Sequence, residues 1–268
     1  MLRIFVERKV RRQVIYRSLL ISSAAFAAIF VLLNTQGADG VLRPVSMFVD
    51  NFEGALYNIA MVLTGGSVSG FTLSPQGSYM ITFSGGNPAL WLQAGYLGCA
   101  LLGALMFFLV NRAPHLLRGL AMLTGAFTVG YLALFIRPDA AGDWLSWIAC
   151  AGFGALLIAL GWKGRGDINQ FRSWKSVTQI VMTVVALMTA LHIVLDLPYI
   201  LSTPARLPDD ATTIINPVAA LVEEHLGGGS VAPIAGLWSA GAIAMLAAAF
   251  YFSISRQLKQ IPKNDDIV

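Results

Sequence analysis

The sequence predicts an all-α integral membrane protein, with six to seven transmembrane helices and a short β-hairpin between the second and third apolar segments. The chain is 56% hydrophobic and 12% charged. Its apolar residues gather into runs of about 20, the length that crosses a hydrocarbon core of about 30 Å. Each run is expected to be helical, because lipid offers no hydrogen-bond partner to a free backbone amide.

Six of these runs are expected to cross the membrane. They cover residues 15–33, 88–110, 120–136, 144–162, 177–195 and 233–254. Trp91 and Trp162 lie near run ends, where interfacial aromatic residues are typical. The sequence therefore predicts one polytopic membrane domain over residues 18–254, with an outer loop at 197–232.

The positions of Lys and Arg predict the orientation of the chain. With six crossings and a cytoplasmic N-terminus, the inner segments hold 15 of the 18 basic residues. They include a basic N-terminal segment, 1–17, and a basic C-terminal tail, 255–268. The predicted location is a bacterial-type inner (plasma) membrane. Because this topology and anionic lipid account for the net charge of +4, the lipid bilayer is a predicted partner and nucleic acid is not.

Segment 45–63 differs from the six runs because it is apolar and yet carries ionisable side chains. Asp50 and Glu53 are three residues apart, on one face of a helix. Ionisable groups at membrane depth are costly, so they usually face a protein interior or a wet cavity and often mark function. We therefore expect these two carboxylates to line a hydrated pocket or to contact a partner. A small-molecule or ion carrier that uses them is a further hypothesis.

Residues 67–84 are predicted to form the β-hairpin. Apolar residues alternate along two short stretches, and Pro75-Gln76-Gly77 supplies a turn in which Gly77 can adopt a positive φ. The hairpin residues that are candidates for binding a partner are Phe71, Leu73, Tyr79, Ile81 and Phe83.

Three glycine motifs follow one another around this hairpin. Thr64-Gly65-Gly66 precedes it, Gly85-Gly86 ends it, and Ala94-Gly95-Tyr96-Leu97-Gly98 lies in the next apolar run. This order resembles the M50B-like branch of the site-2 intramembrane metalloproteases, over residues 45–254. The resemblance implies an HExxH zinc helix that leads into the first motif. It also implies an aspartate ligand in a late helix, which Asp196 matches.

The chain departs from this family pattern at the residues that would perform the chemistry. Aligned from Thr64 without a gap, the two family histidines fall on Glu53 and Tyr57, and the family glutamate falls on Gly54. With one inserted residue the glutamate falls on Glu53, and the flanking positions become Phe52 and Leu56 or Tyr57. Neither alignment restores a histidine. In HExxH enzymes the histidines hold zinc, and the glutamate is the general base that acts on the metal-bound water. We therefore expect no catalytic residues and no metallopeptidase activity.

The resulting functional hypothesis is a catalytically inactive M50B-like protein. It would be a pseudoprotease that serves as a binding, structural or accessory subunit of a complex with other membrane proteins. Site-2 folds present substrates to an edge strand, and such strand addition needs no metal. No cofactor is predicted, although lipid or pigment could bind between the helices.

The alternative is an active intramembrane zinc metalloendopeptidase with non-standard ligands. Glu53, His192 and Asp196 would be the metal-binding residues, because His192 precedes Asp196 by one helical turn. In the simpler interpretation, His192 and Asp196 form a hydrogen-bonded pair and bind no metal.

The number of crossings decides on which side of the membrane the C-terminus lies. Six crossings, with segment 45–63 re-entrant or peripheral, keep the basic segments inside, whereas the family resemblance implies a seventh. We favour six, so a reporter enzyme fused after Val268 is expected to be active in the cytoplasm. A reporter that is active only on the outer side would establish an odd number of crossings.

Overall fold

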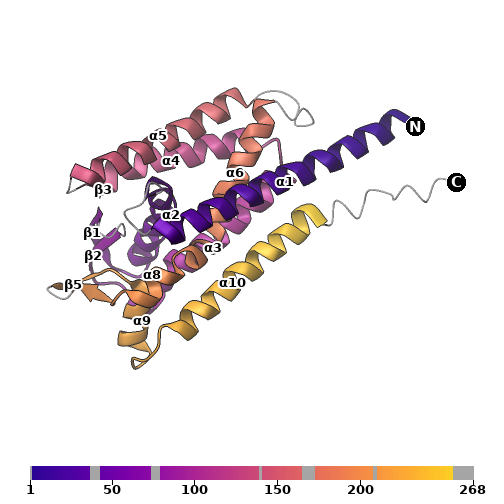
Figure 1. The fold of residues 1–268 in the computed structure, drawn as a ribbon. Coiled ribbons are helices and arrows are strands. Elements are labelled where there is room, and N and C mark those ends of the chain that lie inside the picture. The colour runs from indigo at the N-terminus through magenta and orange to yellow at the C-terminus, as the bar shows by residue number, and fades with distance from the viewer. Residues whose placement is uncertain are drawn as a thin grey trace.

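A computed structural model of the chain describes residues 2–36, 43–73, 79–138, 141–164, 173–207 and 210–255. Helices dominate it (Figure 1). The first part contains α1 (Leu2–Gln36), α2 (Arg43–Leu63), β1 (Ser67–Leu73), β2 (Tyr79–Ser84), α3 (Pro88–Arg112), α4 (Leu117–Phe135), β3 (Ile136–Arg137) and α5 (Ala141–Lys163). The second part contains α6 (Trp174–Ala190), α7 (His192–Leu195), α8 (Leu197–Ser202), β4 (Arg206–Leu207), β5 (Asp210–Ile214), α9 (Pro217–His225), α10 (Ala232–Phe250) and the π-helical η1 (Tyr251–Ser255).

Five helices in the described part of the chain are long and apolar enough to cross a membrane. These spans are Tyr16–Leu33, Pro88–Arg112, Leu117–Phe135, Trp144–Lys163 and Ala232–Ile254. The chain is thus a multi-pass, membrane-embedded protein, and six to seven crossings stay a prediction. The N-terminal end of α1 and the C-terminal end of α10 lie at the same end of the molecule (Figure 1), the arrangement that an even number requires.

The sequence predicts one continuous helix over residues 177–195. This prediction was wrong, because the helix is interrupted in the structure. The apolar helix α6 ends at Ala190, and α7 begins at His192 as a separate single turn. The Thr189 hydroxyl donates to the Val185 carbonyl, a bond that tends to bend helices, and Leu191 has the non-helical angles φ −102° and ψ 19°. This break sets the direction in which the side chains of α7 point.

The strands gather at the end of the molecule away from the α1 N-terminus (Figure 1). β1 and β2 pair antiparallel in a five-stranded sheet with the order β3-β1-β2-β5-β4. The predicted turn Pro75-Gln76-Gly77 lies outside the described residues. Strands β3, β4 and β5 were not predicted. They are short, and β3 begins at the last residue of the run 120–136, which the sequence predicts to be helical throughout.

Glycines let the central helices approach one another closely. α3 packs against α2, α6 and α10. A Cβ added at Gly103 of α3 would lie 2.1 Å from the backbone nitrogen of Ala190, and one at Gly125 of α4 would lie 2.3 Å from the carbonyl oxygen of Gly154 in α5. In lipid, such small residues allow the close backbone packing that holds helices together.

The contact at Gly103 gives a test of this packing. Gly103→Ala is expected to destabilise the protein by about 1–3 kcal/mol, because the backbone of α6 would have to move away. The matched control is Gly130→Ala in α4, where a Cβ meets nothing within 4 Å, and it should be neutral or stabilising by about 0.5–1 kcal/mol. Thermal unfolding in detergent measures both, and equal unfolding temperatures would contradict the packing argument.

Candidate functional site

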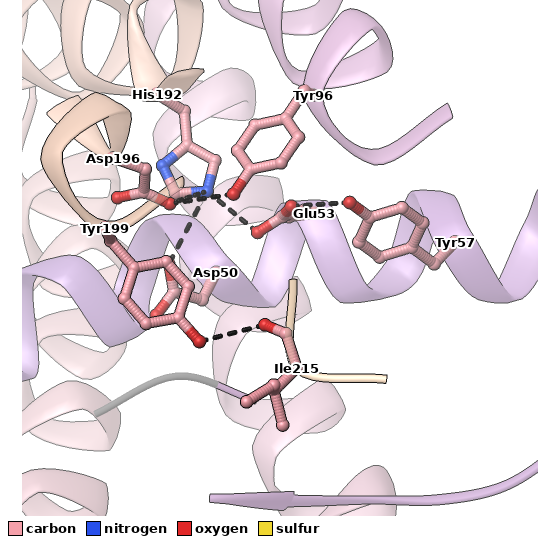
Figure 2. A network of polar contacts seen from close by, with 8 residues as sticks. All are labelled: Asp50, Glu53, Tyr57, Tyr96, His192, Asp196, Tyr199 and Ile215. Carbon is pink, nitrogen blue, oxygen red and sulfur yellow. Dashed lines mark hydrogen bonds and ion pairs between the residues drawn. The ribbon is translucent and has the colours of Figure 1, made fainter. Parts of the chain in front are cut away.

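Three polar side chains of α2 point to one side of that helix (Figure 2). Asp50, Glu53 and Tyr57 are spaced i, i+3 and i+7, which places them along one helical face. α2 lies inside the bundle and packs against α3 and α5, so this polar face does not reach solvent. Asp50 is only 7% exposed and Glu53 only 8%. Two carboxylates are therefore held in the protein interior.

His192 and Asp196 approach these carboxylates from the other side (Figure 2). The Asp196 amide donates to the His192 carbonyl at 2.9 Å, which completes one helical turn and aligns the two side chains. His192 is buried and Asp196 is partly buried. α7 begins after the break at Leu191, and its first residue, His192, reaches Glu53 of α2.

The imidazole lies at the centre of the resulting cluster. His192 Nε2 lies 2.8 Å from Glu53 Oε2, 3.4 Å from Asp196 Oδ2 and 3.6 Å from Asp50 Oδ1. One ligand atom from each of the four residues falls within 4.8 Å of all the others. We call Asp50, Glu53, His192 and Asp196 the carboxylate–histidine cluster.

Two tyrosines hold the carboxylates of this cluster in place. The Tyr57 hydroxyl donates to Glu53 Oε1 at 2.8 Å, and the Tyr96 hydroxyl donates to Asp196 Oδ2 at 3.3 Å. The Tyr96 ring also contacts the His192 ring, with 5.3 Å between their centroids. Tyr57 fits only because Gly95 is opposite it, where a Cβ would lie 2.1 Å from its ring.

The electrostatics of the cluster demand a positive charge. Three ionised carboxylates so close together and shielded from water would repel one another strongly. Among the described residues, the only side chain that forms an ion pair with any of the three is His192. One imidazolium balances one carboxylate, so the others must bind protons or share a cation.

The donor atoms of the carboxylate–histidine cluster are of the kinds that bind metal ions. An imidazole nitrogen and carboxylate oxygens are ordinary ligands of Zn²⁺ and of other divalent transition metals. The alternative ligands predicted from the sequence, Glu53, His192 and Asp196, do come together in the structure. Position 54, on which the family glutamate falls in the ungapped alignment, is a buried glycine.

Asp50 is the fourth member of this cluster and was not among the metal ligands predicted from the sequence. The sequence feature that could have indicated Asp50 is its i, i+3 spacing from Glu53. The distance of either carboxylate from His192, however, depends on the fold. The structure therefore adds a ligand candidate that the one-dimensional pattern could not select.

The hairpin residues proposed to bind a partner are not part of this cluster. Nothing is described of the side chains of Phe71, Leu73, Tyr79, Ile81 and Phe83. Their strands are paired with each other and also on their outer sides, β1 with β3 at Phe71 and β2 with β5 at Ile81. The chain itself therefore occupies part of the strand edges to which an extended partner would bind.

The glycine motifs around the strands pack directly against each other. Gly65, Gly85 and Gly86 have positive φ angles of 86°, 73° and 80°, which favour glycine. A Cβ at Gly66 would lie 2.8 Å from the Gly86 nitrogen, and Thr64 Oγ1 accepts a hydrogen bond from the Asn87 amide at 3.1 Å. The motifs thus join the end of α2 to the start of α3. Farther along α3, Gly98 meets Leu56 of α2.

Comparison with known proteins adds one finding to this geometry. A protein-family model described as Peptidase M50B-like matches residues 21–250. No curated protein and no solved structure matches the chain.

Proposed function

The chain belongs to the Peptidase M50B-like family, and on this premise we propose that it is a non-catalytic member that acts as a binding or accessory subunit of a membrane-protein complex. One observation carries the proposal. Glu53 and Tyr57, which stand where the family has its two zinc histidines, hydrogen-bond to each other at 2.8 Å. The side chains at these two positions therefore stabilise each other instead of presenting two imidazoles to a metal.

The position of the family general base supports the same proposal. Peptide hydrolysis needs a group that removes a proton from the attacking water, and in the ungapped alignment the family glutamate falls on Gly54. With one inserted residue it falls on Glu53, whose carboxylate already contacts Tyr57 and His192. The two carboxylates of α2 are already in contact with His192, at 2.8 Å and 3.6 Å. What remains is a membrane scaffold whose polar interior connects two helices.

The outward face of α10 offers a surface to which a partner helix can bind. Gly236, Ala240, Ala244 and Ala248 are all exposed and recur every four residues. Their spacing forms a line of small residues along one side of the helix, which lets another transmembrane helix approach closely. We call these four residues the α10 small-residue face, and we propose that it contacts the partner subunit.

Bulky substitution on this face tests the binding role. Gly236→Leu combined with Ala240→Leu should reduce the chain's share in a larger complex at least about tenfold, because the leucines prevent close helix approach. The measurement is native gel electrophoresis of chemically crosslinked membranes from the source cells. Ala133→Leu, at an exposed position of α4, is the matched control and should leave the complex intact. A wild-type chain that runs only as a 28.7 kDa monomer would sink the proposal.

The second candidate function is an intramembrane hydrolase that uses Glu53, His192 and Asp196 as ligands. The 4.8 Å grouping of ligand atoms in the carboxylate–histidine cluster favours it. We expect the purified full chain to leave transmembrane-segment substrates uncleaved in lipid vesicles, with or without added Zn²⁺. Cleavage that needs zinc, is lost in Asp196→Ala and persists in the exposed-site control Glu223→Gln would establish the hydrolase and refute the non-catalytic proposal.

A further inference from the structure

We propose that the carboxylate–histidine cluster binds one divalent transition-metal ion through four protein ligands, in a closed site that ties α2 to α7. This inference goes beyond the binding role proposed above. It assigns an ion to the cluster, makes Asp50 the fourth ligand, and gives the ion a structural task with no coordination position left for water or substrate. The inference stands or falls independently of any partner subunit.

Asp50 provides the first argument. Its side chain is 10% exposed, and the ion pair that its carboxylate forms within the described structure is with His192. Its one polar contact is the 3.6 Å approach of Oδ1 to His192 Nε2, and Figure 2 shows it reaching from α2 to the imidazole. A largely buried carboxylate with one charged contact as long as 3.6 Å is poorly compensated, so a cation at this point would stabilise it.

The spacing of the donor atoms provides the second argument. Four ligands at tetrahedral angles, with bonds of about 2.0–2.1 Å, lie about 3.3–3.4 Å from one another. His192 Nε2 lies 3.4 Å from Asp196 Oδ2 and 3.6 Å from Asp50 Oδ1. The 2.8 Å contact to Glu53 would lengthen as a shared ion replaces the direct hydrogen bond, and ligand atoms that lie up to 4.8 Å apart would move closer together.

Charge balance and support from neighbouring residues agree with these distances. Within the described part of the chain, His192 is the one cationic partner of the three carboxylates. A divalent ion bound with a neutral imidazole would offset two of the three negative charges. Tyr57 and Tyr96 each donate a hydrogen bond to a ligand carboxylate, Glu53 and Asp196 respectively. Such outer hydrogen bonds orient metal ligands and raise affinity.

The number of ligands distinguishes this site from a hydrolytic one. Catalytic zinc sites hold the metal with three protein ligands and keep a fourth position for water, whereas structural sites use four. With Asp50 as the fourth donor, the cluster belongs to the structural class. Three carboxylates and one imidazole suit Zn²⁺ or Mn²⁺, and sulfur-seeking metals are disfavoured.

The test uses the purified full-length chain in detergent, stripped with a chelator and reloaded with Zn²⁺ or Mn²⁺. Elemental analysis should find about one ion per chain, and reloading should raise the unfolding temperature. Asp50→Asn and His192→Gln should each weaken the affinity by about tenfold or more. His225→Gln, at an exposed histidine of α9, is the matched control and should bind as the wild type does.

Two results would overturn the proposal. One is a wild-type chain that takes up neither ion and unfolds at the same temperature with and without chelator. The other is an Asp50→Asn chain that binds as tightly as the wild type, which would remove Asp50 from the ligands and reopen the fourth position. If the Asp50→Asn chain fails to fold, the wild-type uptake and its chelator-dependent unfolding still decide the question.

Discussion

The burial of three carboxylates around one imidazole is the constraint on which the interior of this protein depends. In a bundle made largely of apolar helices, Asp50, Glu53 and Asp196 need hydrogen bonds and positive charge from the protein or from an ion. Tyr57 and Tyr96 donate hydrogen bonds to two of these carboxylates, and the His192 imidazole lies between all three. α2 and α7 are therefore joined by an interaction that cannot be weakened without leaving a charge unpaired inside the protein.

Close helix packing makes this polar interior possible. Gly95 gives the Tyr57 ring the space it needs to reach Glu53, and Gly103 lets α3 approach α6 just before the break that orients α7. The glycine motifs at 64–66 and 85–86 fix the end of α2 relative to the start of α3. Residues that perform no chemistry thus determine whether the ionisable residues can meet.

This member of the family carries different residues at the positions that match the family's zinc motif. The fold keeps the order of motifs that accompanies a metallopeptidase centre, while positions 53, 54 and 57 carry glutamate, glycine and tyrosine. Asp50 and His192 add a carboxylate and an imidazole next to those positions. The interior is therefore polar, with residue types that differ from those of the family's zinc motif. In our proposal, this scaffold holds an ion for stability at the place where the family resemblance implies one for catalysis.

The sequence by itself determined the membrane setting, most of the long helices, the family and the residues worth inspecting, because apolar run length, glycine motifs and rare buried charges are local signals. It predicted one helix at 177–195 where the structure has two, and it did not reveal strands β3 to β5, since their two to five residues carry little periodicity. Only the tertiary structure decided that Asp50 joins Glu53, His192 and Asp196. These residues are up to 146 positions apart, and their meeting depends on how α2, α3 and α7 pack, which no local pattern encodes.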